Sequence, residues 1–348
     1  MSGEHRADEN RADGTGRPVD PTPEQEVQAV LADPASRTVV DPTAVNPDLA
    51  DPDFVADVVA PSRDIGAKVG EPLLEVSGLT VRFGGVTALD DVSFTIDRGD
   101  IFGLIGPNGA GKTTCFNAIT GVYEPAAGSV TFDGRPLKRV KRHQITRRGI
   151  ARTFQNVRLF GEMTALENVV VGTDARHRTS VLGAALRLPR HHREERDAVD
   201  RGMALLEFVG IGARAAEKAR NLPYGDQRRL EIARALATEP KLLCLDEPAA
   251  GFNPSEKVAL MELIQKVRDD GFTVLLIEHD MKLVMGVTER IVVLEFGRKI
   301  AEGTPAQVRD DPKVISAYLG VPDESDEAAV GPEDASVPGA GEGDDGRA

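Results

Sequence analysis

The stretch IFGLIGPNGAGKTTCFNAITG, residues 101–121, decides the fold of this chain. Residues 101–105 form a short apolar run, which is typical of a buried strand, and a helical pattern follows the glycines. Between them, residues 106–113 fit the spacing G-x-x-x-x-G-K-[ST] of a phosphate-binding loop. Glycines let such a loop bend tightly, so that its backbone N–H groups and the positive end of the next helix face polyphosphate oxygens. The stretch therefore predicts a nucleotide site.

The loop also predicts contacts for individual side chains. Lys112 is expected to reach the β- and γ-phosphates, and the hydroxyl of Thr113 is expected to ligate Mg²⁺. The alternative is an ordinary glycine-rich turn with a stray lysine, which the match within a strand, loop and helix disfavours. The residues predicted to bind the nucleotide are Gly106, Pro107, Asn108, Gly109, Ala110, Gly111, Lys112, Thr113 and Thr114.

The charge of the chain is concentrated at its two ends. Residues 1–70 contain 14 acidic and 6 basic side chains, and residues 321–348 contain 9 and 1. The remaining residues 71–320 hold 33 acidic and 35 basic side chains. This nearly neutral middle gives no indication of a nucleic-acid-binding surface and leaves a membrane-protein partner open.

Composition divides the chain into three parts. Residues 1–70 contain eight prolines, and residues 321–348 are again rich in Asp, Glu, Gly, Pro and Ala. Such segments bury too little apolar surface to offset the entropy of ordering, so both are predicted to be disordered acidic extensions. A short helix around residues 23–33 is an alternative within the first. One folded domain, residues 71–320, lies between them.

The cysteines and the apolar runs bear on the compartment. Cys115 and Cys244 are the two cysteines, and both are interpreted as small buried hydrophobes of a reduced protein, with a disulfide as the lesser alternative. No apolar run approaches the roughly 20 residues that cross a bilayer. Residues 1–14 also lack the apolar core of a secretion signal. These features predict a cytoplasmic protein.

Together with the phosphate-binding loop, the hydrophobic pattern predicts an α/β fold of the P-loop NTPase class. Alternation of period two predicts an antiparallel β subdomain, and residues 139–148 suit an exposed basic helix. Residues from about 155 to 240 form a predicted α-helical insert, followed by an alternation of strands and helices that implies a mainly parallel sheet with helices on both faces. The predicted strands are residues 73–76, 79–83, 92–96, 128–132, 242–245, 273–277 and 291–296, with turns at Gly84-Gly85, Asp90-Asp91 and Asp133-Gly134 and helices at 194–209 and 255–270.

A second chemical motif is KLLCLDEP, residues 241–248. Its apolar run ends in Asp246 and Glu247, which places two carboxylates at the carboxyl end of a buried parallel strand, where open α/β sheets bind ligands. Asp246 is expected to hold the Mg²⁺ shell, and Glu247 to polarise the water that attacks the γ-phosphorus. A solvated acidic turn is the alternative, and the upstream phosphate loop disfavours it.

A third motif is NLPYGDQRRLEIARALA, residues 221–237, a turn that opens into a helix. Gly225 permits close backbone approach, and the N–H groups of the helix start suit an anion, although an ordinary helix cap has the same pattern. Together with the phosphate loop and the DE strand, this turn and helix resemble the ATP-binding cassette (ABC) family. The resemblance covers about residues 73–320 and implies ATP as the nucleotide.

The resemblance implies roles for further residues. Phe83 stands where the family places an aromatic ring that stacks on adenine. Gln155 matches the glutamine that touches Mg²⁺ and the attacking water and links the site to the helical insert. His279 matches the switch histidine at the γ-phosphate. Glu247, His279, Gln155 and Lys112 are thus the expected catalytic set, and Thr113, Gln155 and Asp246 the expected metal ligands.

The signature turn departs from the general family sequence, Leu-Ser-Gly-Gly-Gln. Tyr224, Gly225 and Asp226 are expected to contact the ATP of an opposite subunit, but Pro223 replaces a serine and supplies neither hydroxyl nor N–H. Asn253, in the loop PAAGFNP, occupies a usual aspartate position. The resemblance thus implies a weakened signature contact within an otherwise complete site.

The variant signature is similar to that of one branch, the ATP-binding subunits of branched-chain amino acid importers. The stretches RFGG, DEPAAGFNP, EHDMKLVMG and AYLG agree with this branch. Related importers carry urea, amides or other small solutes, so the cargo stays open at this point. The implied partners are permease subunits at the inner face of the membrane, a second ABC ATPase, either a paralogue or an identical chain, and indirectly an extracytoplasmic solute-binding protein; no nucleic acid is expected.

Two other functions fit parts of the sequence. A soluble ABC ATPase acting on ribosomes or DNA would usually carry two cassettes or a long coiled coil, and neither is present in the sequence. An ATP-binding interaction or regulatory subunit with weak hydrolysis is suggested by Pro223 and Asn253. Because Glu247 and His279 are intact, we favour the ATPase that drives uptake.

Overall fold

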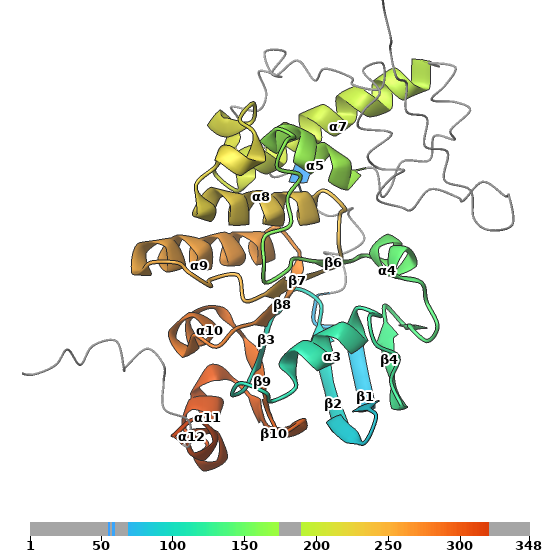
Figure 1. Cartoon of the computed structure of the whole chain (residues 1–348), viewed down its shortest axis with the longest axis vertical. Coiled ribbons are helices and arrows are strands. Elements are labelled where there is room, and N and C mark those ends of the chain that lie inside the picture. The colour runs from blue at the N-terminus through green and yellow to red at the C-terminus, as the bar shows by residue number, and fades with distance from the viewer. Residues whose placement is uncertain (1–54, 56–57, 60–68, 174–188, 320–348) are drawn as a thin grey trace, which may run out of the picture. The chain divides into compact units, whose positions relative to one another are not determined.

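Two β-sheets organise the fold (Figure 1). The computed structural model of the chain describes residues 55, 58–59, 69–173 and 189–319, all within the unit Val45–Ala348. The helix predicted around residues 23–33 and the extension predicted at 321–348 lie outside the described residues.

The antiparallel sheet has the strand order β2-β1-β4-β5. Its strands are β1 (Pro72–Phe83), β2 (Val86–Asp97), β4 (Ala127–Phe132) and β5 (Arg135–Pro136). The two strands predicted at residues 73–83 are one strand, whose register shifts around Gly78, where φ is 59°. The turn predicted at Asp90-Asp91 is wrong. Both residues lie within β2. The strand is irregular here, and the backbone N–H of Asp91 donates to Thr80 Oγ1 at 3.2 Å, so this N–H group has a hydrogen-bond partner inside the sheet.

The central sheet has the strand order β10-β9-β3-β8-β7-β6. All neighbours pair in parallel except β10, which is antiparallel to β9. The strands β3, β7 and β8 are buried along their whole length, as expected for parallel strands covered on both faces. The strand bounds are β3 (Ile101–Ile105), β6 (Ile150–Arg152), β7 (Leu242–Asp246), β8 (Thr273–Ile277), β9 (Arg290–Glu295) and β10 (Arg298–Gly303).

Helices flank the sheets, and their ends follow local sequence signals. Asn253 caps α9 by accepting a hydrogen bond from Glu256 N at 2.9 Å, with Pro254 as the first helical residue. Within the described residues no helix is long and apolar enough to cross a bilayer. The helices are α3 (Lys112–Ile119), α4 (Arg142–Arg148), α9 (Pro254–Asp269), α10 (Met281–Val287), α11 (Pro305–Arg309) and α12 (Pro312–Leu319).

A group of helices forms a subdomain at one end of Figure 1, away from the antiparallel sheet. It contains α5 (Ala165–Thr173), α7 (Pro189–Phe208) and α8 (Tyr224–Leu236), with the 3₁₀ turns η4 (Gly212–Arg214) and η5 (Ala219–Asn221). The predicted apolar face of α7 is buried at Met203, Leu206 and the following Val209, while Val199 is half-buried. The subdomain is thus held by a helical apolar face of the predicted period.

Part of the N-terminal extension contacts this subdomain. Val55 and Val59 are buried, and Arg201 of α7 donates through Nη1 to the backbone carbonyl of Val58 at 2.7 Å. This contact was not predicted from the sequence, because the apolar stretch at residues 54–60 is short and lies within a segment rich in Asp and Pro.

Cys115 and Cys244 are both buried and unpaired, as predicted. Burial raises the pKa of Cys115 to about 12 and raises the pKa of Cys244 as well, so both thiols are inert hydrophobic groups.

Candidate functional site

The predicted site residues lie where neighbouring parallel strands end. The strands β3, β8, β7 and β6 are adjacent in that order, and their carboxyl ends meet at one edge of the sheet. Gly106 follows β3, Glu278 and His279 follow β8, Glu247 follows β7, and Gln155 lies shortly after β6. Residues that are far apart in sequence are thereby gathered at the edge where open α/β sheets bind ligands.

The phosphate loop has the backbone that its glycines predict. Gly106, Gly109 and Gly111 have φ of 150°, 79° and 98°. A Cβ at Gly106 would lie 2.1 Å from the carbonyl oxygen of Leu294, and one at Gly111 would lie 2.9 Å from that of Ala88. No side chain fits at either position without displacing backbone, so these two glycines are required by close packing as well as by conformation. Gly111 is also the N-cap of α3, which directs the first N–H groups of that helix into the loop.

Lys112 is folded back onto the loop. Its Nζ donates to the carbonyl oxygens of Gly106 at 2.6 Å and Pro107 at 3.0 Å, and the residue is buried. Burial lowers the pKa of Lys112, while the nearby carboxylates of Glu247 and Asp246 act in the opposite direction. The positive charge of Lys112 is thus held at the phosphate loop. This charge and the backbone N–H groups of the loop suit polyphosphate oxygens.

Two of the predicted catalytic side chains lie against the carboxylate of a third, Glu247. Gln155 donates through Nε2 to Glu247 Oε2 at 2.8 Å, and His279 Nδ1 lies 3.9 Å from the same oxygen. The neighbouring Asp246 is buried, and burial raises its pKa, while the positive charge of Arg152 lowers it. Two adjacent carboxylates therefore occupy different environments, one buried beside an arginine and one open to the site.

The aromatic residue expected to stack on adenine is accessible. Phe83 is 44% exposed at the end of β1, and its ring meets the edge of the Tyr123 ring with centroids 4.9 Å apart. Tyr123 follows α3, and its N–H donates to the carbonyl of Asn117 in that helix at 3.1 Å. Sequence reasoning missed Tyr123, which links the predicted adenine platform to the helix of the phosphate loop.

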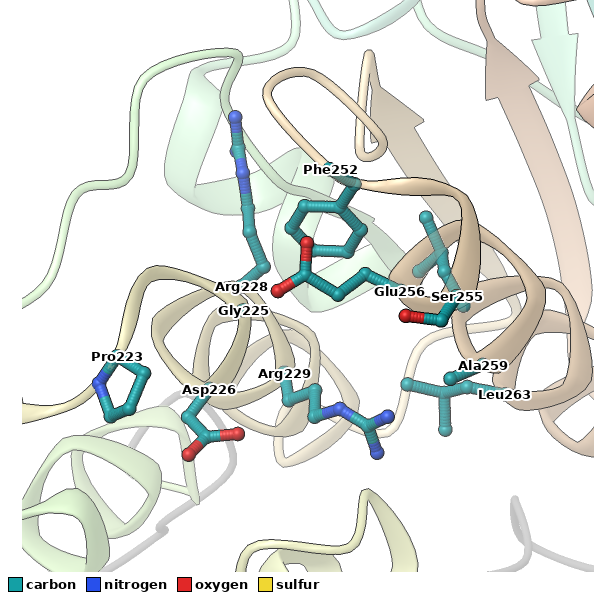
Figure 2. Close-up of a pocket in the computed structure, with 11 residues that line it drawn as sticks. Pro223, Gly225, Asp226, Arg228, Arg229, Phe252, Ser255, Glu256, Ala259 and Leu263 are labelled. Atoms are coloured by element: carbon teal, nitrogen blue, oxygen red, sulfur yellow. The ribbon is translucent and has the colours of Figure 1, made fainter.

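The turn before α8 lies in a different place from the phosphate loop. A pocket of about 280 Å³ between α8 and α9 is lined by Pro223, Gly225 and Asp226 on one side and by Phe252 and Glu256 on the other (Figure 2). No residue of the phosphate loop lines this pocket, and Figure 1 shows α8 well separated from the start of α3. The turn and the loop of one chain therefore do not surround a common cavity.

Comparisons with known proteins agree on one family. The sequence profile of the ABC transporter family matches residues 89–250, and the profile described as branched-chain amino acid ATP-binding cassette transporter matches residues 298–324. The high-affinity branched-chain amino acid transport ATP-binding protein BraF of Pseudomonas aeruginosa is 49% identical over 253 residues, which cover 72% of this chain and 99% of BraF. The chain belongs to the ABC family of transporter ATPases.

Solved structures place the fold in the same family. A nucleotide-free ATP-binding cassette of an ABC transporter is 33% identical, with a TM-score of 0.63, and the match covers 72% of this chain and all of that one. A dimeric post-hydrolysis cassette bound to ADP and Pi is 26% identical, with a TM-score of 0.56 over 67% of this chain and 99% of that one. The chain is therefore an ATP-binding and ATP-hydrolysing subunit of an ABC transporter with the predicted P-loop fold.

A buried ion pair in this cassette clamps the segment around Gln155. Arg228 of α8 donates to the backbone carbonyls of Phe154, at 2.7 Å, and of Gln155. Glu231, 3.3 Å from Arg228, accepts a hydrogen bond from the N–H of Phe154 at 3.4 Å. This pair was not predicted from the sequence. A usable signal was present, because the two opposite charges are three residues apart on a helix face that also carries buried apolar residues.

Glu278 is a second residue that sequence reasoning left without a role. It is fully buried and accepts hydrogen bonds from the N–H of Ala249 at 2.8 Å and of His279 at 3.1 Å. Burial raises the pKa of Glu278, and these backbone donors lower it. The Glu278 side chain thus links the loop after Glu247 to the backbone of His279.

Proposed function

We propose that this cassette is the ATPase of an importer for branched-chain amino acids. The observation that carries the proposal is the 49% identity with BraF over nearly the whole of that protein. The match of residues 298–324 to the branched-chain amino acid profile supports the same cargo from a separate part of the chain. A related small solute is the alternative cargo, since the ATPase does not itself contact the solute in an importer of this design.

The proposed chemistry follows from the groups around Glu247. Glu247 polarises a water for attack on the γ-phosphorus, Gln155 orients that carboxylate and the water, and His279 and Lys112 stabilise charge on the phosphate oxygens. The hydrogen bond between Gln155 and Glu247 supports this assignment, because it already places the amide against the catalytic oxygen. Phe83 and the glycines of the phosphate loop bind the rest of ATP.

Mg²⁺ is the proposed metal. The expected ligands are the hydroxyl of Thr113, the amide oxygen of Gln155 and the carboxylate of Asp246, which are hard oxygen donors of the kind that Mg²⁺ prefers. Such an oxygen set does not suit a soft metal, and within the described residues there is no group of three or more His, Cys, Asp or Glu side chains that could hold a metal by themselves. When bound with ATP, Mg²⁺ would neutralise charge that develops on the phosphates.

The complete site is proposed to need two cassettes. Tyr224, Gly225 and Asp226 would cover the ATP held by the phosphate loop of a second subunit, either an identical chain or a paralogue. The separation of the two motifs within one chain supports this arrangement, as does the dimeric relative bound to ADP and Pi. Hydrolysis would then separate the two subunits, because ADP and phosphate repel each other.

A groove beside the Gln155 segment is the proposed contact with the permease. It has a volume of about 510 Å³ and is lined by Arg158, Phe160 and Val171, together with Arg234 of α8. Phe160 and Val171 are 40% and 37% exposed, so the groove offers apolar surface to a helix of a membrane-spanning subunit. The cassette would thus be held at the cytoplasmic face of the membrane, with a solute-binding protein delivering cargo on the other side.

Pro223 supports a second candidate, a subunit that binds ATP and hydrolyses it weakly. The residue precedes α8, makes no side-chain cap and has no N–H to offer to phosphate. By contrast, Asn253 caps α9 through its side-chain oxygen, a role that Asn and Asp fill equally well, so its departure from the family sequence is structurally neutral. Turnover by the purified subunit, alone and with its partner ATPase, separates the two candidates.

The test of the ATPase role is Glu247→Gln. We expect this variant to bind ATP with unchanged affinity and to lose turnover by about 10²–10³-fold, because the amide cannot polarise water. It should also trap an ATP-bound dimer, detectable by light scattering, and abolish uptake of leucine in cells that depend on this transporter. Lys112→Ala is the contrasting variant and should lose ATP affinity. Undiminished ATPase activity of Glu247→Gln would refute the assigned role.

A further inference from the structure

Arg152, the last residue of β6, joins two parts of the site that the sequence presents separately. Its side chain is 16% exposed, and Nη2 donates to Asp246 Oδ2 at 3.0 Å. Nη1 donates to Asn117 Oδ1 at 2.6 Å and, more weakly, to Thr120 Oγ1 at 3.4 Å. One guanidinium therefore connects the carboxylate at the end of β7 with the helix behind the phosphate loop.

The orientation of this guanidinium is fixed by stacking as well as by hydrogen bonds. Its central carbon lies 4.3 Å from the ring centroid of Phe116 and 5.0 Å from that of Phe154. A planar group with several donors keeps such contacts simultaneously, whereas the ammonium of a lysine is a point charge on a flexible stem. The environment of Arg152 thus selects arginine rather than positive charge alone.

The contact uses only one oxygen of Asp246. Among the described residues, no group donates a hydrogen bond to Oδ1 of Asp246. A carboxylate that is held through one oxygen presents its other oxygen in a defined direction, as do metal-ligating side chains that are oriented by an outer partner. We propose that Arg152 is a positioning residue for Mg²⁺, holding Asp246 by Oδ2 so that Oδ1 faces the metal of bound MgATP. This inference rests on the Mg²⁺-dependent function proposed above.

A purely structural role is the rival explanation. Removing one partner of a buried ion pair destabilises a protein whatever its function, because the other charge is left unpaired. The two roles differ in what nucleotide binding shows. If the role is structural, substitution of Arg152 lowers the affinity for ATP equally with and without Mg²⁺. If the role is positioning, the substitution changes nucleotide binding only when Mg²⁺ is present.

The experiment compares Arg152→Gln with the whole wild-type chain. ATP affinity is measured in EDTA, and the Mg²⁺ concentration that half-saturates the ATP-dependent thermal shift is measured separately. We expect Arg152→Gln to raise this Mg²⁺ concentration about 10–100-fold while ATP affinity in EDTA stays within about twofold of wild type. The Mg²⁺ concentration required by Arg152→Lys should lie between those of the wild type and Arg152→Gln. Arg148→Gln is the control, since its guanidinium donates to the Pro136 carbonyl and has no carboxylate partner in the described structure.

The outcomes separate the inference from the proposed function. An unchanged Mg²⁺ requirement in Arg152→Gln, or an equal loss of ATP affinity in EDTA and in Mg²⁺, would overturn the positioning role. If Arg152→Gln does not fold, Asn117→Leu removes an anchor of the guanidinium and leaves the ion pair. It should raise the Mg²⁺ requirement in the same direction, and an unchanged requirement would again overturn the role. A wild-type subunit whose ATP binding and turnover ignore Mg²⁺ would instead overturn the proposed function.

Discussion

Glu247 has a strained backbone conformation. Its backbone has a φ of 47°, a left-handed conformation that costs a non-glycine residue roughly 1–2 kcal/mol. The conformation is held by a hydrogen bond from Glu247 N to the carbonyl of Ile277 at 2.9 Å. It coincides with the turn that brings the carboxylate to Gln155 and His279. Backbone strain of this kind is typical of functional positions and is stabilised by the surrounding sheet.

The sequence indicated which side chains gather at the edge of the central sheet better than it indicated their contacts. The acidic pair after an apolar run was evident, because strand period and chemistry coincide there. Arg152 was not predicted, because its partner Asp246 lies 94 residues further along the chain and no local pattern links them. Glu278 was missed for a related reason, since a buried carboxylate held by backbone N–H groups leaves no side-chain pattern in the sequence.

Asp100 provides a prediction of pH dependence. Burial raises the pKa of Asp100 to about 6, and repulsion from Asp97 and Glu289 adds to the shift. The folded state therefore binds this proton more tightly than the unfolded chain, and stability falls as pH rises through the window from 3.8 to about 6. We expect Asp100→Asn to raise the free energy of unfolding by about 1 kcal/mol at alkaline pH, after allowing for the solvent-exposed half of the group, and to have little effect near pH 4.

The control for this prediction has the opposite sign. The hydrogen bond from Lys241, with that from Arg98, lowers the pKa of Asp133, so its stabilising contribution is present above the unfolded pKa and is lost as pH falls through the folded pKa. Asp133→Asn should therefore destabilise the protein at alkaline pH, where Asp100→Asn stabilises it. Urea unfolding at both pH values measures the two effects. An Asp100→Asn effect that does not change with pH would contradict the assignment.

At the scale of elements, α8 is attached to the segment that carries Gln155. Arg228 and Glu231 are 3% and 2% exposed and bond to the backbone on both sides of Phe154. Since α8 begins at the signature turn, the clamp ties the part of the chain that is proposed to face a second subunit to the part that contacts Glu247. These two elements are therefore expected to move together when nucleotide is hydrolysed.

This clamp predicts strongly non-additive mutations. Arg228→Met and Glu231→Leu should each lower the free energy of unfolding by about 3–5 kcal/mol, because each leaves a buried charge without its partner, and the double variant should lose much less than the sum. Glu217→Leu is the control. Glu217 pairs with Arg214 at the same spacing but on the surface, and its loss should cost less than about 1 kcal/mol. Additive losses in urea unfolding of the buried pair would rule out the clamp.

The elements that the sequence missed or misplaced are those decided by distant partners. The three-residue strand β6 is too short for a hydrophobic period, and it exists because it pairs with β7. Residues 72–83 were divided at Gly78, since a glycine in an alternating pattern resembles a turn, whereas pairing with both β2 and β4 keeps the strand continuous. The fully buried strands β7 and β8 were predicted closely because their apolar runs need no partner to be recognised.

At the scale of the whole molecule, a nearly neutral cassette carries acidic ends. The two family profiles match from residue 89 onward, and the match to BraF covers 72% of this chain and 99% of BraF. Val55 and Val59 are nevertheless buried, and Arg201 of α7 holds the Val58 carbonyl. Through these described residues the extension is attached to the helical subdomain, and that subdomain also carries the proposed permease groove.

Val59→Asp tests this attachment in the full chain. A carboxylate placed at a fully buried valine is expected to release the segment. The free energy of unfolding then falls by no more than the docking of this segment contributes. Two buried valines and one hydrogen bond amount to about 2–4 kcal/mol at most. Val69→Asp is the matched control, because Val69 also belongs to the extension but is 68% exposed, and its substitution should cost less than about 0.5 kcal/mol. Limited proteolysis should cut within residues 55–68 faster in Val59→Asp than in the control. Equal cleavage of the two variants would mean that the extension is not docked in solution.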